Sequence, residues 1–414
     1  MKPEIRNARS EGNPNAETRY PMLATVSRRK ANRTARSRLS GFQLPLSKPL
    51  SSQRESAQSS KESERTDVRC YGLKRNPRAF GLRIPSLCAS ALAALLGLCC
   101  FAAPVTAAPK KLVIAVIPKG ATHNFWKSIH AGALKAASEL GNVDILWKSG
   151  LKEDDRDSQI KVVEDMVIRK VDGIVLAPLD DTALRPAVND AVRNGIPVVI
   201  VDSDLKTDKY VSFIATDNYK GGVKAGERLA ELLQGKGRVA MLRYAEGSAS
   251  TMQREQGFLD ALKQHPGLEL VSANQYGGAT TETAYKASEN LLAPFRKADG
   301  SLSLDGIFAC NESTTFGMLR ALQDAKWAGK VTYVGFDSSA MLIKAMENRE
   351  LQGLILQNPM QMGYLGVKTV VAHLKDEKVE KRIDTGATVA TPENMNQPAI
   401  RQLLEPDVKK WLKE

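Results

Sequence analysis

Polar side chains directly follow several apolar runs of this sequence, and their chemical types suit hydrogen bonding to a polyhydroxylated molecule. Carboxylates such as Asp202 and Asp337 can each accept hydrogen bonds from two hydroxyl groups, and a guanidinium group can bridge two oxygens. Aromatic rings such as those of Phe125 and Trp126 can pack flat on an apolar C–H face of the same molecule. The candidate ligand-binding residues are Lys119, His123, Phe125, Trp126, Asp202, Arg254, Asn311, Asp337 and Gln357.

Each of these residues also has a purely structural interpretation. An Asp or Asn that ends a strand often only caps the next helix, and this applies to Asp202 and Asn311. Phe125 and Trp126 fall at the start of an expected helix and could both belong to the core, while Arg254 could be a solvated charge. The binding-site interpretation therefore depends on whether the set converges on one place from two parts of the chain.

The sequence lacks the common motifs of catalytic, cofactor and metal sites. No G-x-S-x-G, P-loop, C-x-x-C or H-E-x-x-H pattern occurs. Gly221, Gly222 and Gly226 do not have the dinucleotide-binding spacing, and close helix packing explains them better. The histidines, none of which has metal-ligand spacing, are His123, His130, His265 and His373. We therefore expect a binding protein without a catalytic residue, a cofactor or a metal ion.

Cysteine usage argues against a disulfide framework in the body of the chain. Four of the five cysteines lie within the first 100 residues, and the fifth is Cys310. A single thiol cannot form an internal disulfide. Because Cys310 ends the apolar run 307–310, we expect it to be a buried strand residue.

From residue 111 onward, apolar runs alternate with segments of helical periodicity. Such runs are typical of strands covered on both faces, and helices between them imply βαβ units and a parallel sheet. The predicted strands are 112–117, 143–147, 173–177, 197–201 and 213–216, then 238–242, 268–272, 306–310, 331–335 and 352–357. The predicted helices are 125–140, 158–170, 182–194, 221–233, 251–264, 281–295, 314–324, 339–348 and 360–374. The fold class is therefore α/β, with two doubly wound parallel-sheet lobes.

The loops after the strands are where a ligand site is expected, because doubly wound sheets bind ligands beyond the carboxyl ends of their strands. Lys119 and His123 lie in the loop after the first strand, and Asp202 follows the fourth. Asp337 and Gln357 follow strands of the second series. The candidate residues thus come from both expected lobes.

The net charge of +13 is concentrated at the start of the chain. Residues 1–85 carry 19 basic and 7 acidic side chains, whereas the remaining residues carry 40 basic and 39 acidic ones. The body of the chain is thus nearly neutral, and nothing in it indicates a polyanionic partner. We expect no nucleic-acid partner.

Residues 1–108 are expected to precede the folded body. Residues 1–82 are rich in Arg, Ser, Asn, Gln and Pro, which is typical of a disordered basic leader, or of a translation start assigned too far upstream. A basic flank, an apolar run and small residues at the end predict a secretory signal peptide at 83–108. An uncleaved membrane anchor is one alternative. A lipoprotein modified at Cys99 or Cys100 is a weaker one, because Leu98 or Cys99 would stand where Gly, Ala or Ser is preferred. The signal peptide predicts a periplasmic location.

Six short segments of the body carry a family resemblance through their order and spacing. They are Asn-Phe-Trp at 124–126, Ile-Pro-Val-Val at 196–199, Ile-Ala-Thr-Asp-Asn at 214–218, Gln-Arg-Glu-Gln-Gly-Phe at 253–258, Ala-Cys-Asn-Glu at 309–312 and Val-Gly-Phe-Asp at 334–337. With these segments, the chain from about Lys111 to Lys381 resembles the ribose-binding class of periplasmic binding proteins. That class shares its fold with the core of the lactose-repressor family.

The resemblance implies a type I fold, in which a multi-strand hinge joins the two lobes. The chain would cross between the lobes near 216–218, Ser338 and 358–359. The N-terminal lobe would comprise 109–216 with 358–385, and the C-terminal lobe 217–357 with 386–414.

The resemblance also implies a sugar held between the lobes and trapped when the hinge closes. Phe125 and Trp126 would then be the aromatic rings that sandwich the sugar, with Lys119 and His123 in the same loop. The implied polar ligands are Asp202, Arg254, Asn311, Asp337 and Gln357. Because Ser203 stands where ribose binders carry Arg, we expect a monosaccharide or similar small polyhydroxy ligand, such as a polyol, rather than ribose in particular.

A protein of this class is the solute-binding component of an ABC importer, and it presents its ligand to a permease in the inner membrane. We expect this chain to do so as a monomer. Two alternatives are a ligand sensor that contacts a receptor, and a transcription regulator of the lactose-repressor type. The basic leader contains no helix-turn-helix pattern, and the signal-like run separates it from the core, which argues against the regulator.

Overall fold

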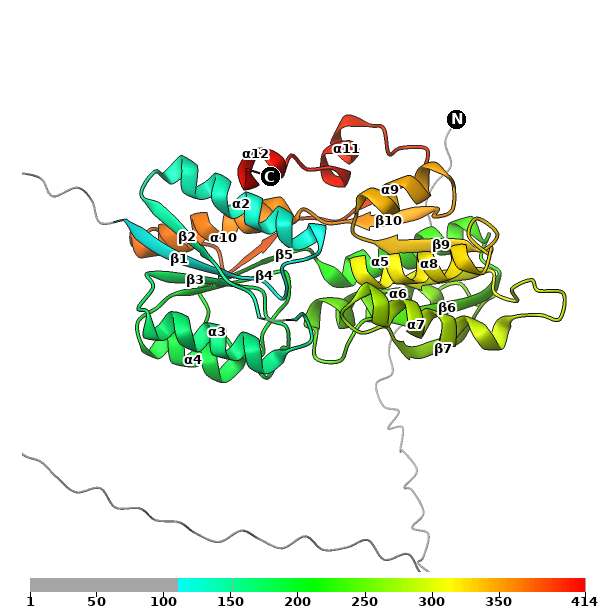
Figure 1. Ribbon diagram of the computed structural model, residues 1–414, viewed down its shortest axis with the longest axis horizontal. Coiled ribbons are helices and arrows are strands. Elements are labelled where there is room, and N and C mark those ends of the chain that lie inside the picture. Colours follow the sequence, from blue (N-terminus) through cyan, green and yellow to red (C-terminus); the bar gives the residue numbers. More distant parts are fainter. Residues whose placement is uncertain (1–110, 151, 414) are drawn as a thin grey trace, which may run out of the picture. The chain divides into compact units, whose positions relative to one another are not determined.

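The computed structural model describes residues 111–150 and 152–413, which form two α/β lobes (Figure 1). The predicted leader and signal peptide lie outside the described residues. Within the described part, each strand and helix predicted between 112 and 374 is present, with ends that differ by a few residues. No helix of this part is long and apolar enough to span a bilayer. The predicted fold class is confirmed.

The first lobe contains a six-stranded sheet in which all neighbouring strands are parallel. Its strands are β1 (Leu112–Ile117), β2 (Val143–Trp147), β3 (Gly173–Leu176), β4 (Val198–Val201), β5 (Ser212–Ala215) and β11 (Arg382–Asp384). Their spatial order is β11-β5-β4-β3-β1-β2. The central strands are short apolar runs that are buried along their whole length, as expected for a sheet covered on both faces.

The second lobe contains a sheet of corresponding order. Its strands are β6 (Gly237–Arg243), β7 (Leu268–Tyr276), β8 (Gly306–Ala309), β9 (Thr332–Phe336), β10 (Gly353–Leu356) and β12 (Thr388–Ala390), in the spatial order β12-β10-β9-β8-β6-β7. The edge strand β12 pairs antiparallel with β10, which departs from the predicted all-parallel sheet. Because the two orders correspond, β4 and β9 occupy equivalent positions.

Helices cover both faces of each sheet. In the first lobe, α2 (Asn124–Leu140) and α10 (Pro359–Leu374) pack on one face, and α3 (Arg156–Ile168) and α4 (Arg185–Arg193) on the other (Figure 1). In the second lobe, α5 (Asn218–Leu232) and α6 (Ala249–Lys263) form one layer. The opposite layer is α7 (Thr281–Leu292), α8 (Glu312–Asp324) and α9 (Ala340–Glu347). Each lobe thus has its own apolar core.

Local signals begin and end these helices. Gly141 ends α2 in the left-handed conformation, with φ of 75°, and its N–H bonds to the carbonyl of Ala137. Asp217 begins α5 by accepting a hydrogen bond from the Lys220 N–H. The turn at Asp217 also lies where the chain leaves the first sheet for the second.

The chain passes between the lobes at three places. These are 216–217 between β5 and α5, 357–358 between β10 and α10, and 385–387 between β11 and β12. The prediction that Ser338 is a crossover is wrong, because Ser338 lies between β9 and α9 within the second lobe. Its hydroxyl donates instead to the carbonyl of Leu404.

The C-terminal segment also connects the lobes, through packing. Helix α11 (Pro398–Leu404) buries Ile400 and Leu404 in the core of the second lobe. Helix α12 (Lys409–Leu412) then contacts α2 of the first lobe, although the sequence placed 386–414 with the second. The segments β11, β12, α11 and α12 were not predicted, because each is at most seven residues long and lacks an extended apolar pattern.

Candidate functional site

All nine predicted site residues line one cavity in the cleft between the lobes, which we call the cleft cavity. Five further residues line it, namely Glu153, Tyr244, Ser250, Thr251 and Glu312. The cavity measures about 30 Å³, which leaves room for only about two or three water molecules at about 10–15 Å³ each. Side chains from the two lobes therefore meet across the cleft in this closed arrangement.

Asp202 and Asp337 occupy equivalent places in the two lobes, directly after β4 and β9. Both have left-handed backbone conformations, with φ of 62° and 68°. Such a conformation costs a non-glycine residue roughly 1–2 kcal/mol, although Asp tolerates it better than most residues. Strained residues of this kind cluster at functional sites, where the strain fixes the direction of a side chain.

Lys119 connects the lobes through its buried ammonium group. Its Nζ atom lies 3.0 Å from Oδ2 of Asp202 in the first lobe. The same atom donates to the hydroxyl groups of Ser248 at 3.3 Å and Ser250 at 3.2 Å, both in the second lobe. The predicted loop lysine therefore bridges the two lobes across the cleft.

Arg254 is fixed in the second lobe as a rigid donor. Its guanidinium group lies 4.1 Å above the ring of Phe336 and donates to Asn218 Oδ1 at 2.8 Å and to the Cys310 carbonyl at 3.1 Å. Its Nη2 atom is 3.8 Å from Asp202 Oδ1 and has no hydrogen-bond partner among the described residues. The interpretation of Arg254 as a solvated charge is wrong, because its side chain is only 2% exposed.

Among the described residues, Gln357 has a buried acceptor without a partner, just as Arg254 has a buried donor without one. Its Nε2 atom donates to Oδ1 of Asp337 at 2.7 Å. Its Oε1 atom is buried and, within the described part of the chain, lacks a hydrogen-bond partner. Burial raises the pKa of Asp337 despite the opposing effect of the Arg254 charge. Buried polar atoms without partners are rare in folded proteins and point to a ligand or water.

The cap interpretation holds for Asn311 and fails for Asp202. The Asn311 side chain accepts from the Thr314 N–H, and the Thr314 hydroxyl pairs with the Asn311 backbone in a capping box. Asn311 therefore begins α8 while it borders the cavity. The carboxylate of Asp202 instead faces Lys119 and Arg254.

Both predicted aromatic residues border the cavity and also belong to the core of the first lobe. The rings of Phe125 and Trp126 meet edge to face, 4.9 Å apart. The Trp126 indole N–H donates to Glu153 Oε1 at 2.6 Å, and His123 Nδ1 lies 2.7 Å from the same oxygen. Burial lowers the pKa of His123, but Glu153, Glu312 and Asp337 together raise it above its ordinary value. Glu153 thus orients two of the predicted residues.

Glu153 itself could have been found from the sequence. It lies in the loop after β2, and the rule that ligands bind beyond the carboxyl ends of strands covers that loop as well. Glu312 directly follows the predicted residue Asn311, so it also lies just beyond the end of a strand. The contact of Ser250 with a lysine 131 positions away has no local sequence signal.

Cys310 is fully buried beside Glu255, as predicted for a strand-end residue. Its Sγ atom lies 3.6 Å from Glu255 Oε1. Burial raises the pKa of the Cys310 thiol, which keeps it protonated and unreactive. Across the part that the structure describes, no group of three or more His, Cys, Asp or Glu side chains could hold a metal ion.

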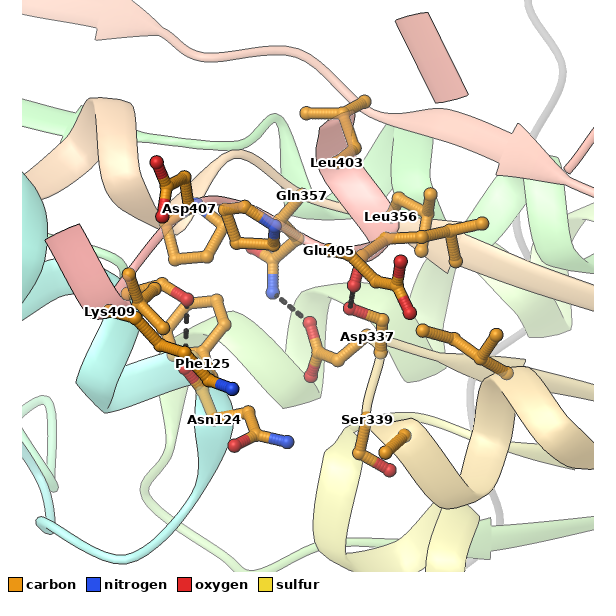
Figure 2. A pocket seen from close by; sticks show the side chains of 18 residues that line it. Asn124, Phe125, Asp337, Ser339, Leu356, Gln357, Leu403, Glu405, Asp407 and Lys409 are labelled. Atoms are coloured by element: carbon orange, nitrogen blue, oxygen red, sulfur yellow. Dashed lines mark hydrogen bonds between the residues drawn. The ribbon is translucent and has the colours of Figure 1, made fainter. Parts of the chain in front are cut away.

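A second cavity, which we call the wide cavity, adjoins the cleft cavity and measures about 560 Å³. Phe125, Asp337 and Gln357 line both cavities. Figure 2 shows Asp337 and Gln357 hydrogen-bonded on its wall, with the C-terminal residues Glu405 and Asp407 nearby. The remaining wall includes the apolar residues Ile343, Leu356, Leu403, Leu404 and Val408.

Comparisons with known proteins give consistent similarities. A family described as periplasmic binding protein domain matches residues 114–378. Ribose import binding protein RbsB of Haemophilus influenzae is 32% identical over 259 residues, which cover 63% of this chain and 84% of that protein. The structure of an ABC transporter solute-binding protein from Agrobacterium vitis with bound D-fucose is 36% identical, with a TM-score of 0.67, over 71% of this chain and 100% of that one. A solute-binding protein from Agrobacterium radiobacter in complex with D-arabinose is 32% identical, with a TM-score of 0.67, over 72% and 100%.

Proposed function

Because the chain belongs to the periplasmic binding protein family, we propose that it is the sugar-binding component of an ABC importer and closes its lobes around a monosaccharide. This makes it a transport component and not an enzyme. The observation that carries the ligand class is the pair of unpaired atoms in the cleft, Arg254 Nη2 and Gln357 Oε1. One is a donor and the other an acceptor.

A sugar hydroxyl fits this pair because it both donates and accepts hydrogen bonds. Arg254 can donate to one hydroxyl oxygen, and Gln357 can accept from a hydroxyl proton. Leaving either atom buried and unpaired costs about 1–3 kcal/mol, which a polyhydroxy ligand would relieve. The names of the similar proteins, which include D-ribose, D-fucose and D-arabinose binders, support the same ligand class.

We propose that the nine candidate residues contact this ligand in distinct ways. Phe125 and Trp126 would pack on its C–H faces, held by Glu153. Asp202 and Asp337 would accept from its hydroxyl groups. The remaining polar contacts would come from Lys119, His123, Arg254, Asn311 and Gln357.

Ligand entry requires the lobes to separate, because the cleft cavity of about 30 Å³ is far smaller than a sugar ring. We infer that residues 109–216 with 358–385 and residues 217–357 with 386–404 move as two bodies, with α12 packed on α2 of the first. The three crossovers would form the hinge. Closure would then trap the ligand and display both lobes to the permease.

We propose a periplasmic location, which membership of the periplasmic binding protein family supports. We propose that residues 83–108 are the signal that exports it, and that it acts as a monomer with no nucleic-acid partner. The permease partner follows from the ABC transporter components to which the chain is similar. Polyols are a second ligand group that the same hydrogen-bonding atoms could accept.

A thermal-shift screen tests the proposal, because a ligand of the folded state raises the melting temperature. The panel would contain pentoses, hexoses, polyols and, as a contrast, amino acids. At a ligand concentration 100 times Kd the stabilisation is about 2.7 kcal/mol, which corresponds to a shift of about 5 °C or more. A shift by at least one sugar or polyol supports the proposal. A shift by amino acids alone would contradict it.

A further inference from the structure

The carboxyl group of Glu312, in the second lobe, reaches across the cleft to the first lobe. The Asn124 N–H donates to Glu312 Oε1 at 3.2 Å, and the Phe125 N–H donates to Glu312 Oε2 at 3.1 Å. Both donors belong to the first turn of α2. One side chain of the second lobe therefore satisfies two backbone groups of the first.

Helix α2 has no cap from its own lobe. The N-cap residue His123 makes no side-chain capping bond, although its carbonyl accepts from the N–H groups of Trp126 and Lys127. The N–H groups of Asn124 and Phe125 are among the groups that no helix can satisfy internally. The start of a helix also carries a partial positive charge that favours a carboxylate.

Helix α8, which carries Glu312, does not need this carboxyl group for its own cap. Asn311 and Thr314 already form a capping box at that end. Glu312 is only 8% exposed, and a buried carboxyl group is costly unless it is hydrogen-bonded. Its contact with α2 therefore explains its position better than the stability of α8 does.

We propose that Glu312 is a latch between the lobes: its carboxyl group caps α2 only when the cleft is closed, and so it stabilises the ligand-bound form. Opening the hinge would separate the two lobes and return the Asn124 and Phe125 N–H groups to water. The latch rests on the proposed function, since it stabilises the closed form that retains the sugar. Glu312 is a positioning residue in this account.

The latch is connected to the ligand site. The Glu312 N–H donates to Oδ2 of Asp337 at 3.0 Å, and Asp337 Oδ1 accepts from Gln357. Phe125, one of the latched residues, borders the cleft cavity. Closure of the latch therefore fixes the aromatic residue and the carboxylate on opposite sides of the cavity.

Closure of this latch should take up protons. The pKa of Glu312 is raised from its ordinary 4.5 to about 7, mainly by burial and also by the charge of Asp337, against the opposing effects of His123 and the Phe125 N–H. In the open form, where water reaches the carboxyl group, its pKa returns towards the ordinary value. A pKa that is higher in the closed form favours closure at low pH, and this advantage is lost as the pH rises through about 7. His123, which faces Glu312, also has a raised pKa, but its partner Glu153 belongs to the same lobe, so that part of the increase persists in the open form and Glu312 carries the pH dependence of closure.

The test compares wild type, Glu312→Ala and Glu312→Gln by titration calorimetry with D-fucose, D-ribose and D-arabinose at pH 6 and pH 8. We expect Glu312→Ala to lower affinity about tenfold at pH 6, because both N–H groups lose their acceptor. Glu312→Gln keeps an acceptor oxygen but cannot titrate in this range, so it should restore part of the affinity and reduce its pH dependence. Glu282→Ala is the matched control, because Glu282 lies in the first turn of α7 and is exposed.

Small-angle X-ray scattering of the protein without sugar tests the latch separately from the ligand. Glu312→Ala should increase the radius of gyration at pH 6, because the closed form loses its latch, whereas Glu282→Ala should not. A wild type that binds no sugar, together with an increased radius of gyration in Glu312→Ala, would contradict the proposed function but support the latch. Unchanged scattering and unchanged affinity in Glu312→Ala would overturn the latch. So would a pH dependence in Glu312→Gln equal to that of wild type.

Discussion

Two cavities adjoin at the junction of the lobes, and the larger one has mostly exposed charged residues while the smaller one has buried ones. The wide cavity of about 560 Å³ has ample space. Apart from Asp337, which it shares with the cleft cavity, its charged wall residues Glu405, Asp407 and Lys409 are exposed on the C-terminal segment. The cleft cavity of about 30 Å³ has little space, but its walls hold buried and mutually bonded charges. Arg254 and Asp202 are 2% and 4% exposed there.

This difference shows that fixed polar groups, and not volume, mark the site. Exposed side chains must lose rotamer freedom when they bind a ligand, which lowers affinity, whereas buried and hydrogen-bonded side chains have already lost it. The cleft also contains two buried polar atoms without partners in the described part of the chain, Arg254 Nη2 and Gln357 Oε1, and its volume can increase when the hinge opens. The wide cavity, by contrast, depends on how the C-terminal segment lies over the lobes. Four predictions test whether binding depends on the cleft and is insensitive to the wide cavity.

The largest effect is expected from Arg254→Met, which keeps the stem of the side chain but removes the guanidinium group. Sugar affinity should fall about 100-fold or more, because the ligand loses a charged donor and the carboxylates of Asp202 and Asp337 each lose a nearby positive charge. Titration calorimetry measures this. Arg238→Met is the matched control, since Arg238 also lies near an aromatic ring in the second lobe but is far from the cleft. Equal sugar affinities of the two variants would show that Arg254 does not bind the ligand.

A somewhat smaller loss is expected when the equivalent carboxylates are neutralised. Asp202→Asn and Asp337→Asn should each weaken binding about 30-fold, because hydroxyl groups lose a charged acceptor. Asn tolerates the left-handed backbone, so melting should change little. Asp202→Ala and Asp337→Ala, which remove the acceptor altogether, should instead abolish binding without unfolding the protein, at a cost of roughly 1 kcal/mol in stability. Wild-type affinity in both Asn variants would show that these residues serve the backbone turn alone.

Glu153→Gln should have a moderate effect. We expect a three- to tenfold loss of affinity, because Trp126 and His123 lose the carboxylate that orients them. The pKa of His123, followed by NMR, should fall, since Glu153 is the main group that raises it. A His123 pKa that does not change in the variant would contradict this role.

The smallest effect should come from filling the wide cavity. Leu403→Trp should change sugar affinity less than twofold, whereas Ser250→Leu, which adds bulk to the cleft cavity, should abolish binding. Both variants place a larger apolar side chain in a cavity wall, so they are matched in kind. A large loss of sugar affinity in Leu403→Trp, together with normal affinity in Ser250→Leu, would show that the sugar binds in the wide cavity instead.

Much of the fold was predictable, because apolar runs and helical periodicity are local. The rule that ligands bind beyond the carboxyl ends of strands also selected residues of both lobes that line one cavity. It succeeded because equivalent strands of the two lobes end at equivalent places. Contacts that depend on how the lobes meet were not predictable. The Lys119 contact with Ser250 and the Glu312 contact with α2 join residues more than 100 positions apart and leave no local pattern. The edge strand β11 was missed because its three residues are largely polar.

The most direct test of the account is a crystal structure of the protein with the sugar that stabilises it most. We predict that the sugar lies in an enlarged cleft cavity, between Phe125 and Trp126, with hydroxyl groups within hydrogen-bond distance of Arg254 Nη2 and Gln357 Oε1. A sugar in the wide cavity, or one in the cleft that leaves both atoms without a partner, would contradict it.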